Sequence, residues 1–525
     1  MEVKSLFNGF MDSLRRFPQR PALEINEEVF TYEQLGSKIS ALQQVIQENE
    51  KNQDPFIAIF AHRSLTAYTG ILGVLASGKG YLSLNPKFPI ERTRTMFLLS
   101  KSRFLIVGRE CLDQLSSFLS GIADSITVLV PDVSEIKDVA GQFPKHHFLT
   151  SKDIRGGGSR VSPSKISGES FAYLVFTSGS TGVPKGVPIT HKNIMAYLEN
   201  VSGDYDESDR FSQAYDLTFD ASVGDLFICW HRGACLVCIP EESTMAPAQL
   251  IKEKHLTRWD SVPSVIAFML KLKILKPNTF PSLRRSVFGG EPLTDYFAQV
   301  WQKSAPNSVI ENRYGPTEAT VEIMQYRWSK ESPALSVNGI VPIGWLFKGQ
   351  RACIMNENEQ IVPRGQAGEL CINGSQLAGG YWNDPEKTRE KFVRFHFSGD
   401  LIWYRTGDRV KQDENGCFYF LGRMDEQVKI RGYRVELQEI DSILRKASGY
   451  AEAVSIAWPI KNGMVEGIRA FISGAQNKSE AEIITHCRQF LPEYMVPRRI
   501  YFIEKMPINA SGKIDRKKLA ESLRE

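Results

Sequence analysis

The clearest chemical signal in the chain is a stretch of hydroxyls and glycines with a lysine near its end, between Tyr173 and Val187. Apolar residues 173–176 predict a buried strand, and the polar stretch follows it directly. Glycines let the backbone approach a ligand closely, while hydroxyls, backbone N–H groups and a lysine can surround phosphate oxygens. The residues that we assign to this phosphate-binding loop are Thr177, Ser178, Gly179, Ser180, Thr181, Gly182 and Lys185.

This loop does not have the spacing of the Walker phosphate loop. The Walker pattern requires Ser or Thr directly after its lysine, whereas Gly186 follows Lys185. A flexible surface linker is the alternative interpretation, but linkers rarely follow an apolar strand with so ordered a pattern. We therefore expect a phosphate-binding loop of another kind.

A second motif, Asn-Arg-Tyr-Gly-Pro-Thr-Glu-Ala-Thr, spans residues 312–320. Its Gly-Pro pair predicts a turn that presents Tyr314, Thr317 and Glu318 together. A hard carboxylate such as Glu318 suits Mg²⁺, which usually binds through one or two carboxylates plus phosphates. From its residues alone, the motif therefore predicts a turn that brings an aromatic ring, a hydroxyl and a carboxylate to one place.

Asp220 lies between Phe219 and a segment with hydrophobic periodicity, so it has two interpretations. It can be a helix N-cap, a position at which aspartate is common. It can also face a partly dry pocket, where a single carboxylate favours a cation and rejects a plain fatty acid.

In this order, the motifs resemble those of the adenylate-forming superfamily, which contains acyl-CoA ligases, firefly-type luciferases and nonribosomal-peptide adenylation domains. The resemblance covers nearly the whole chain. It implies that Tyr314 stacks on adenine, that Thr317 contacts phosphate and that Glu318 holds Mg²⁺. It also implies that Asp408 binds both ribose hydroxyls and that Arg423 contacts ribose or phosphate. Lys513 matches the adenylation lysine of the family, although an exposed lysine is ordinarily a solvated charge.

The resemblance also implies an amino-acid substrate, because Asp220 matches the aspartate that binds the α-ammonium and Phe219 an aromatic residue that gates access. The pocket aligned by motif consists of Asp220, Ala221, Gly224, Asp260, Val287, Gly289, Arg313, Val321, Glu322 and Lys513. If Asp260, Arg313 and Glu322 pair with one another and fill the space, the substrate is glycine or alanine. If the net negative charge of these three residues instead remains uncompensated within the protein, it favours lysine, ornithine or arginine as the substrate. We favour the small amino acid.

The implied reaction uses ATP and Mg²⁺. The substrate carboxylate attacks the α-phosphate, and positioning and electrostatics by Lys513, Glu318 and the loop that begins at Thr177 stabilise the developing charge. A phosphopantetheine thiol of a separate carrier protein then takes the aminoacyl group, after the small domain has rotated about Asp425. The alternatives are an acyl-CoA or aryl-CoA ligase, which has no use for Asp220, and an inactive nucleotide-binding module.

Length and composition agree with this interpretation. The chain has 525 residues and a net charge of +4, which is too small to imply nucleic-acid binding, and no apolar run is long enough to span a membrane. Scattered cysteines predict reduced thiols in a cytoplasmic protein, including Cys235 and Cys238 on one buried strand. Because the given sequence shows no helix-rich carrier segment with a modifiable serine after residue 525, we expect a stand-alone adenylation enzyme, and we separately expect a monomer.

Alternating helical and strand patterns predict an α/β fold with parallel sheets. We expect a large N-terminal domain of subdivided α/β sheets over residues 1–424 and a small, mobile α+β domain over residues 426–525, with the hinge at Asp425. Among the expected elements are helices over Leu6–Phe17, Phe30–Val45 (capped by Thr31) and Ala67–Ala76, and from near Thr190, Leu437 and Glu480. The expected strands include Phe56–Phe60, Ala453–Ile456 and Arg469–Ile472, and a hairpin turns at Asn415-Gly416.

Overall fold

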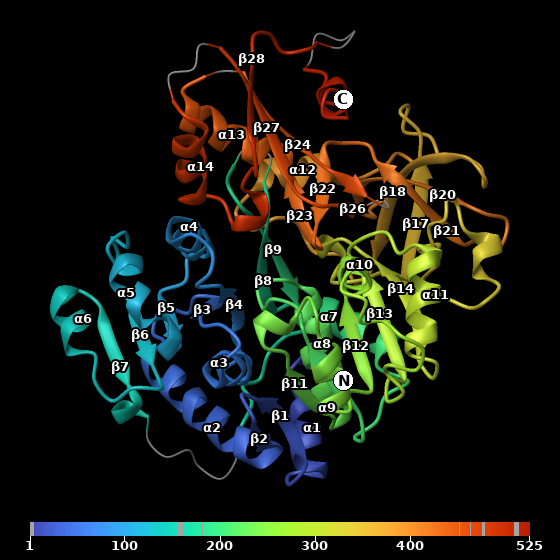
Figure 1. Cartoon of the computed structure of the whole chain (residues 1–525). Helices are drawn as coiled ribbons and strands as arrows, with labels where there is room; N and C mark the ends of the chain where they lie inside the picture. Colours follow the sequence, from blue (N-terminus) through green and yellow to red (C-terminus); the bar gives the residue numbers. More distant parts are fainter. Residues whose placement is uncertain are drawn as a thin grey trace.

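The computed structural model describes residues 5–154, 161–179, 182–450, 452–461, 464–474, 478–508 and 514–524. Three predicted site residues, Ser180, Thr181 and Lys513, lie outside the described residues. A large α/β body carries a smaller C-terminal unit on one side (Figure 1).

A seven-stranded sheet supplies the phosphate-binding loop. In spatial order its strands are β7 (His147–Thr150), β6 (Thr127–Val130), β5 (Phe104–Val107), β3 (Phe56–Phe60), β4 (Gly80–Leu84), β8 (Phe171–Thr177) and β9 (Lys185–Thr190). Its neighbours are parallel except for the β8–β9 pair, which is antiparallel. The loop therefore connects two adjacent strands at one edge of this sheet.

A nine-stranded sheet supplies the second group of motifs. Its order is β16 (Trp345–Leu346), β15 (Met324–Arg327), β14 (Val309–Tyr314), β13 (Arg285–Gly289), β12 (Arg258–Ser261), β10 (Arg210–Gln213), β11 (Cys235–Cys238), β1 (Pro21–Ile25) and β2 (Glu28–Thr31). The strands from β14 to β1 are parallel, so their carboxyl ends share one edge, where ligands bind in open α/β sheets.

Helices connect these strands and bury their apolar faces. They are α1 (Asn8–Arg16), α2 (Tyr32–Asn49), α3 (Leu65–Ala76), α4 (Ile90–Ser100), α5 (Leu112–Leu119), α6 (Lys137–Gln142), α7 (His191–Val201), α8 (Ala221–Arg232), α9 (Ala248–Glu253), α10 (Pro263–Lys271) and α11 (Asp295–Ser304). One apolar core combines residues of both sheets with residues of α2, α3, α7 and α8. The two sheets are thereby fixed relative to each other.

A five-stranded sheet completes the large body, together with α12 (Pro385–Lys391). It contains β17 (Gln350–Met355), β18 (Ala367–Gly374), β20 (Trp403–Gln412) and β19 (Phe392–Val393), with β21 (Phe418–Arg423) paired to β20. The predicted turn at Asn415-Gly416 joins β20 to β21, with Gly416 at a φ of +79°. Asp408 and Arg423 face each other across this hairpin.

The small C-terminal unit begins with a hairpin of β22 (Gln427–Ile430) and β23 (Tyr433–Glu436). A three-stranded sheet of β24 (Ala453–Ala457), β27 (Ile468–Ser473) and β28 (Ile500–Ile503) follows, with α13 (Leu437–Ser448), α14 (Glu480–Arg488), α15 (Arg516–Glu521) and the short strands β25 (Ile460–Lys461) and β26 (Met464–Val465). It has its own apolar core. The hinge at Asp425 and the limits 1–424 and 426–525 remain predictions.

The predicted helices and strands are confirmed where a capping residue and the hydrophobic periodicity indicated the same element. Thr31 and Gln34 form a reciprocal capping box at α2, and Thr190 caps α7. β3 has the predicted bounds, and the predicted helices at residues 6–17 and 67–76 correspond to α1 and α3. None of the eight cysteines is in a disulfide bond, and no described helix is long and apolar enough to cross a membrane.

Candidate active site

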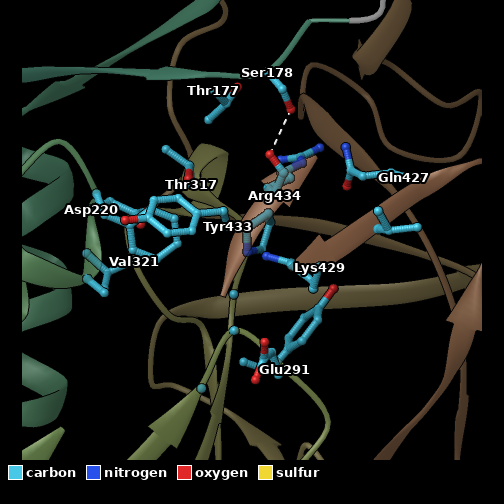
Figure 2. A pocket seen from close by; sticks show the side chains of 18 of the residues that line it. Thr177, Ser178, Asp220, Glu291, Thr317, Val321, Gln427, Lys429, Tyr433 and Arg434 are labelled. Carbon is cyan, nitrogen blue, oxygen red and sulfur yellow. Dashed lines mark hydrogen bonds between the residues drawn. The ribbon is translucent and has the colours of Figure 1, made fainter. Parts of the chain in front are cut away.

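A cavity of about 460 Å³ lies where the two large sheets, the β20–β21 hairpin and the small unit meet (Figure 2). Most of the predicted site residues line it: Thr177, Ser178, Phe219, Asp220, Ala221, Gly289, Arg313, Tyr314, Thr317, Val321, Glu322, Asp408 and Arg423. The other described site residues do not line it: Gly179, Lys185, Gly224, Asp260, Val287 and Glu318 are buried, and Gly182 is partly buried. The topology thus brings together residues that are more than 200 positions apart in the sequence.

The phosphate-binding loop connects Thr177 at the end of β8 to Lys185 at the start of β9, and these two residues are paired across the strands. A Cβ on Gly179 would collide with the Val183 carbonyl oxygen, so only glycine fits there. Gly182 has a φ of +83°, which also favours glycine. The buried Thr177 hydroxyl has no hydrogen-bond partner among the described residues, and so it can take a ligand oxygen.

Lys185 supplies the positive charge of the loop. Its ammonium lies 5.0 Å from the centre of the Tyr381 ring, and burial, followed by the Arg434 charge, lowers its pKa to about 8. The lysine is therefore mostly charged at neutral pH, and its surroundings balance this charge poorly. This is expected for a group that binds an anionic ligand.

Glu318 is fully buried and makes two strong contacts. Its Oε1 accepts a hydrogen bond from the Tyr381 hydroxyl at 2.7 Å, and its Oε2 accepts one from Nη1 of Arg434 at 2.7 Å. Burial opposes ionisation, but Arg434 and Lys185 outweigh it and lower the pKa of Glu318 to about 2.

The chemistry of this carboxylate fits a magnesium ion that is shared with phosphate oxygens. The described residues contain no cluster of three or more His, Cys, Asp and Glu side chains, so a site made by protein ligands alone is absent from them. A single ionised carboxylate near the phosphate-binding loop matches the usual Mg²⁺ arrangement. Such binding requires Arg434 to leave Oε2.

The three residues predicted to bind the nucleoside converge. The Tyr314 hydroxyl donates a hydrogen bond to Oδ2 of Asp408, and Nη1 of Arg423 donates to its Oδ1 at 2.7 Å. Arg423 also forms a bridge with Asp425, in which its Nε lies 2.9 Å from Oδ1. These residues come from β14, β20 and β21, so a planar base and a diol could be held between them.

Asp220 occupies the N-cap position of α8, yet its side chain makes no capping hydrogen bond. It is 5% exposed, and burial raises its pKa to about 6 despite the opposing effects of the Thr317 hydroxyl and Lys429. The capping interpretation therefore does not explain the side chain. Beside it, the Phe219 ring lies 5.9 Å from the Tyr433 ring, across the entrance from the small unit.

The charged residues of the predicted pocket are paired. Nη1 of Arg313 donates to Oε2 of Glu322 at 3.0 Å, and Nη2 donates to Glu311 at 2.6 Å. Asp260 pairs instead with Arg258, which the sequence interpretation missed. The signal was present, because residues two apart on a strand share a face.

Arg434 and Lys429 were also missed, although both reach the cavity. They face each other across the β22–β23 hairpin, and burial lowers the pKa of Lys429 to about 8. Two basic residues placed symmetrically about the Arg431-Gly432 turn of a hairpin were the available signal. Nothing local indicated that this hairpin enters the site.

Two family descriptions match the chain: AMP-binding enzyme over residues 10–382, and AMP-binding enzyme C-terminal domain over residues 439–513. The chain belongs to the AMP-binding enzyme family. The predicted superfamily and the two-part α/β fold are thereby confirmed, and with them an enzyme of the adenylate-forming type.

Among curated proteins, the chain is similar to parts of larger synthases from two Brevibacillus species. Tyrocidine synthase 1 of Brevibacillus parabrevis is 32% identical over 524 residues, which cover 99% of this chain and 45% of that protein. Gramicidin S synthase 1 of Brevibacillus brevis is 31% identical over 529 residues, which cover 99% of this chain and 44% of that protein. The chain thus spans less than half the length of either relative.

Among solved structures, the chain resembles the Vibrio cholerae adenylation domain AlmE in complex with glycyl-adenosine-5′-phosphate. The TM-score is 0.90 and the identity 30%, with 100% of this chain and 98% of that chain covered. The similarity therefore extends over both the large body and the small C-terminal unit.

Proposed function

We propose that the enzyme activates a small amino acid, glycine or alanine, as its adenylate and transfers the aminoacyl group to the phosphopantetheine thiol of a separate carrier protein. The observation that carries this proposal is the pairing of charges around the pocket. Asp220 faces the cavity, whereas Asp260, Arg313 and Glu322 have partners within the protein.

Asp220 supports an amino acid over a plain carboxylic acid. A buried carboxylate is stable when a cation compensates it, and an α-ammonium supplies that cation. A fatty or aromatic acid would leave Asp220 with only the charge of Lys429, whose effect on the carboxyl does not outweigh burial. The acyl-CoA ligase alternative gives this residue only a capping role, and the structure shows no capping bond.

The neighbouring charges support a small side chain over a cationic one. With Arg258 on Asp260 and Arg313 on Glu322, the surplus negative charge expected from the sequence is neutralised. The Arg258 guanidinium lies over the rings of Tyr205 and Phe211, with its central carbon 4.8 Å and 4.9 Å from their centres. A lysine or arginine substrate would therefore find neither Asp260 nor Glu322 free to pair with its side chain.

The space behind Gly224 is filled as well. A Cβ on Gly224 would lie 2.9 Å from the Tyr197 hydroxyl, and that hydroxyl donates a hydrogen bond to Oε2 of Glu322 at 3.1 Å. The room that the glycine seemed to leave is thus taken by a tyrosine from α7. The glycyl-adenosine-5′-phosphate in the AlmE structure supports the same substrate class.

The proposed chemistry rests on positioning. A substrate carboxylate oxygen attacks the α-phosphorus of ATP and pyrophosphate leaves, while Lys185, the Thr177 hydroxyl and Lys513 stabilise charge on the phosphate oxygens. When bound on Glu318, Mg²⁺ would neutralise further phosphate charge. Asp408 and Tyr314 hold the nucleoside. The carrier thiol then attacks the acyl carbon of the adenylate, and AMP leaves.

A pyrophosphate-exchange panel over all amino acids, in both enantiomers and with fatty and aromatic acids included, tests the proposal. We expect glycine or alanine to give the highest kcat/KM. A best substrate with a cationic side chain would contradict the pocket assignment, and a best substrate without an amino group would contradict the role of Asp220. Transfer is tested by loading of a phosphopantetheinylated carrier protein.

The pH profile of amino-acid activation should show the ionisation of Asp220. Because the free enzyme has a pKa of about 6 at this carboxyl, it is charged at pH 8 and becomes neutral as the pH falls through about 6. We expect kcat/KM for the amino acid to fall roughly tenfold for each pH unit below that value. The Asp220→Asn variant should not show this fall of kcat/KM with pH. A wild-type profile that stays flat down to about pH 5 would contradict the assignment.

A further inference from the structure

A buried carboxyl group next to the substrate pocket takes no part in the chemistry proposed above. Asp225 lies on α8, directly after the pocket residue Gly224, and its side chain is fully buried. Neither of its carboxyl oxygens has a hydrogen-bond partner among the described residues. An ionised carboxylate that is buried without a donor is costly in free energy, and such a group normally binds a proton instead.

Asp260 on β12 is the neighbour that can share this proton. It lies within hydrogen-bond reach of Asp225. Its Oδ2 accepts a hydrogen bond from Nη2 of Arg258, whereas its Oδ1 is buried and has no partner among the described residues. Two ionised carboxylates would repel each other here, but a protonated Asp225 can donate to this free oxygen. Burial, followed by the charge of Asp260, raises the pKa of Asp225 well above its usual range.

The other groups around Asp225 do not compensate a negative charge on it. The charged and titratable groups that face it are Asp260 and Arg258 of β12, Tyr68 of α3, Cys229 of α8, and Tyr215 and Glu322. Burial raises the pKa of the two tyrosines and of the cysteine, so none of these three is charged at neutral pH. Arg258 is the one cation in this described set. Its guanidinium is paired with Asp260 and forms no hydrogen bond with Asp225.

We propose that Asp225 keeps a proton at neutral pH and donates it to Asp260, and that this proton prevents a surplus negative charge beside the pocket. The ion pairs of Asp260 with Arg258 and of Glu322 with Arg313 are balanced in charge. An ionised Asp225 would add one uncompensated negative charge, which a basic substrate side chain would neutralise. Asp225 is thus a positioning residue that acts on substrate selection through Asp260. To that extent the inference rests on the proposed specificity for a small amino acid.

Infrared spectroscopy tests the proton directly, because a protonated carboxyl has a C=O stretching band that a carboxylate lacks. The difference spectrum between the wild type and Asp225→Asn at neutral pH should contain this band. The matched difference for Asp113→Asn, on an exposed aspartate of α5, should contain only the bands of a carboxylate. A difference spectrum of Asp225→Asn that also shows only carboxylate bands would overturn the proposal.

The pH dependence of stability gives a second measure. The folded protein keeps the proton, while the unfolded chain releases it above the usual aspartate pKa of 3.8, so the wild type loses stability as the pH rises. Asp225→Asn, which has an amide donor and no proton to release, should not show this loss. Between about pH 5 and 7, the unfolding constant of the wild type should rise relative to that of the variant by about tenfold for each pH unit. Urea titrations measure this ratio, and a ratio that does not change with pH would overturn the proposal.

A third experiment asks whether the proton depends on Asp260. In Asp260→Asn, Arg258 loses its carboxylate partner, and Asp225 becomes the carboxyl group that can compensate it. Asp225 should then ionise. The band of the protonated carboxyl should therefore be absent from the difference spectrum between Asp260→Asn and the double variant Asp225→Asn/Asp260→Asn. Persistence of the band would overturn the proposed sharing.

The pyrophosphate-exchange panel relates the proton to substrate selection. The amide of Asp225→Asn has the shape, the donor and the neutral charge of the protonated acid, so the variant should keep the wild-type order of substrates. A wild type that prefers a basic amino acid, together with a variant that has lost this preference, would overturn the proposal. The infrared and urea measurements need no substrate. A wild type that shows the carboxyl band but activates no amino acid would therefore refute the proposed function and leave the protonated state of Asp225 established.

Discussion

Asp220→Ala is expected to lower kcat/KM for amino-acid activation by on the order of a hundredfold or more. The buried ammonium of the substrate would lose its counter-charge, and removal of one member of such a pair typically costs about 3–5 kcal/mol. The KM for ATP should barely change, because Tyr314 and Asp408 make the proposed nucleoside contacts elsewhere. Pyrophosphate exchange at varied amino-acid and ATP concentrations measures both quantities.

Thermal stability of the same variant separates a binding role from a capping role. Loss of an N-cap would lower the free energy of unfolding by about 0.5–2 kcal/mol and leave turnover intact. Asp220 makes no capping bond, so we expect a melting temperature at or above that of the wild type. Asp220→Asn, which keeps the shape without the charge, is the matched control and should lose activation as well. A variant that melts earlier but activates its best substrate normally would contradict the amino-acid assignment.

Lys513→Ala is expected to reduce adenylation by about 10²–10³-fold. By resemblance, this lysine places its charge on the phosphate and carboxylate oxygens during the attack, and the alanine variant cannot. Transfer from a preformed adenylate should be largely unaffected, because the same resemblance implies that the small unit carries the lysine away between the two steps. Exchange assays and single-turnover transfer assays on one preparation separate the two reactions.

Lys517→Ala is a suitable control, since Lys517 lies close in sequence and is exposed on α15. It should leave both half-reactions unchanged. Near-normal pyrophosphate exchange by Lys513→Ala would refute its role, and equal loss of both half-reactions would point to a structural effect. Lys513 itself lies outside the described residues, so these assays are the direct test of its assignment.

Local patterns predicted the elements, and the resemblance predicted which elements meet. The capping box at Thr31 and the alternation of helix and strand were sufficient for α2 and the parallel sheets, because capping and periodicity act within a few residues. No local pattern places Tyr314 against Asp408, which is 94 positions away. That contact follows from how β20 packs beside the nine-stranded sheet.

The interpretation of the pocket failed where side chains from other elements intrude. Gly224 suggested free space, but Tyr197 of α7 fills it, and the packing of α7 against α8 decides that. Asp260 suggested a charge available to the substrate, but Arg258 neutralises it. Arg434 reaches Glu318 because of how the small unit docks on the large body, and no pattern within a few residues of Arg434 indicates that docking.

The separate apolar core of the small unit has a consequence for how the protein melts. Its core residues on β23, α13, β27 and α14 form a cluster of their own, and the connection to the large body passes through residues 424–426, where Met424 is 52% exposed. Such a unit can unfold cooperatively by itself, so heat denaturation need not follow a two-state transition. A ligand that favours docking of the β22–β23 hairpin should bring the melting transitions of the small unit and the large body closer together. A ligand that displaces the hairpin should move these two transitions apart. We therefore expect the shape of a melting curve to depend on whether a ligand favours or opposes docking of the small unit, as well as on ligand affinity.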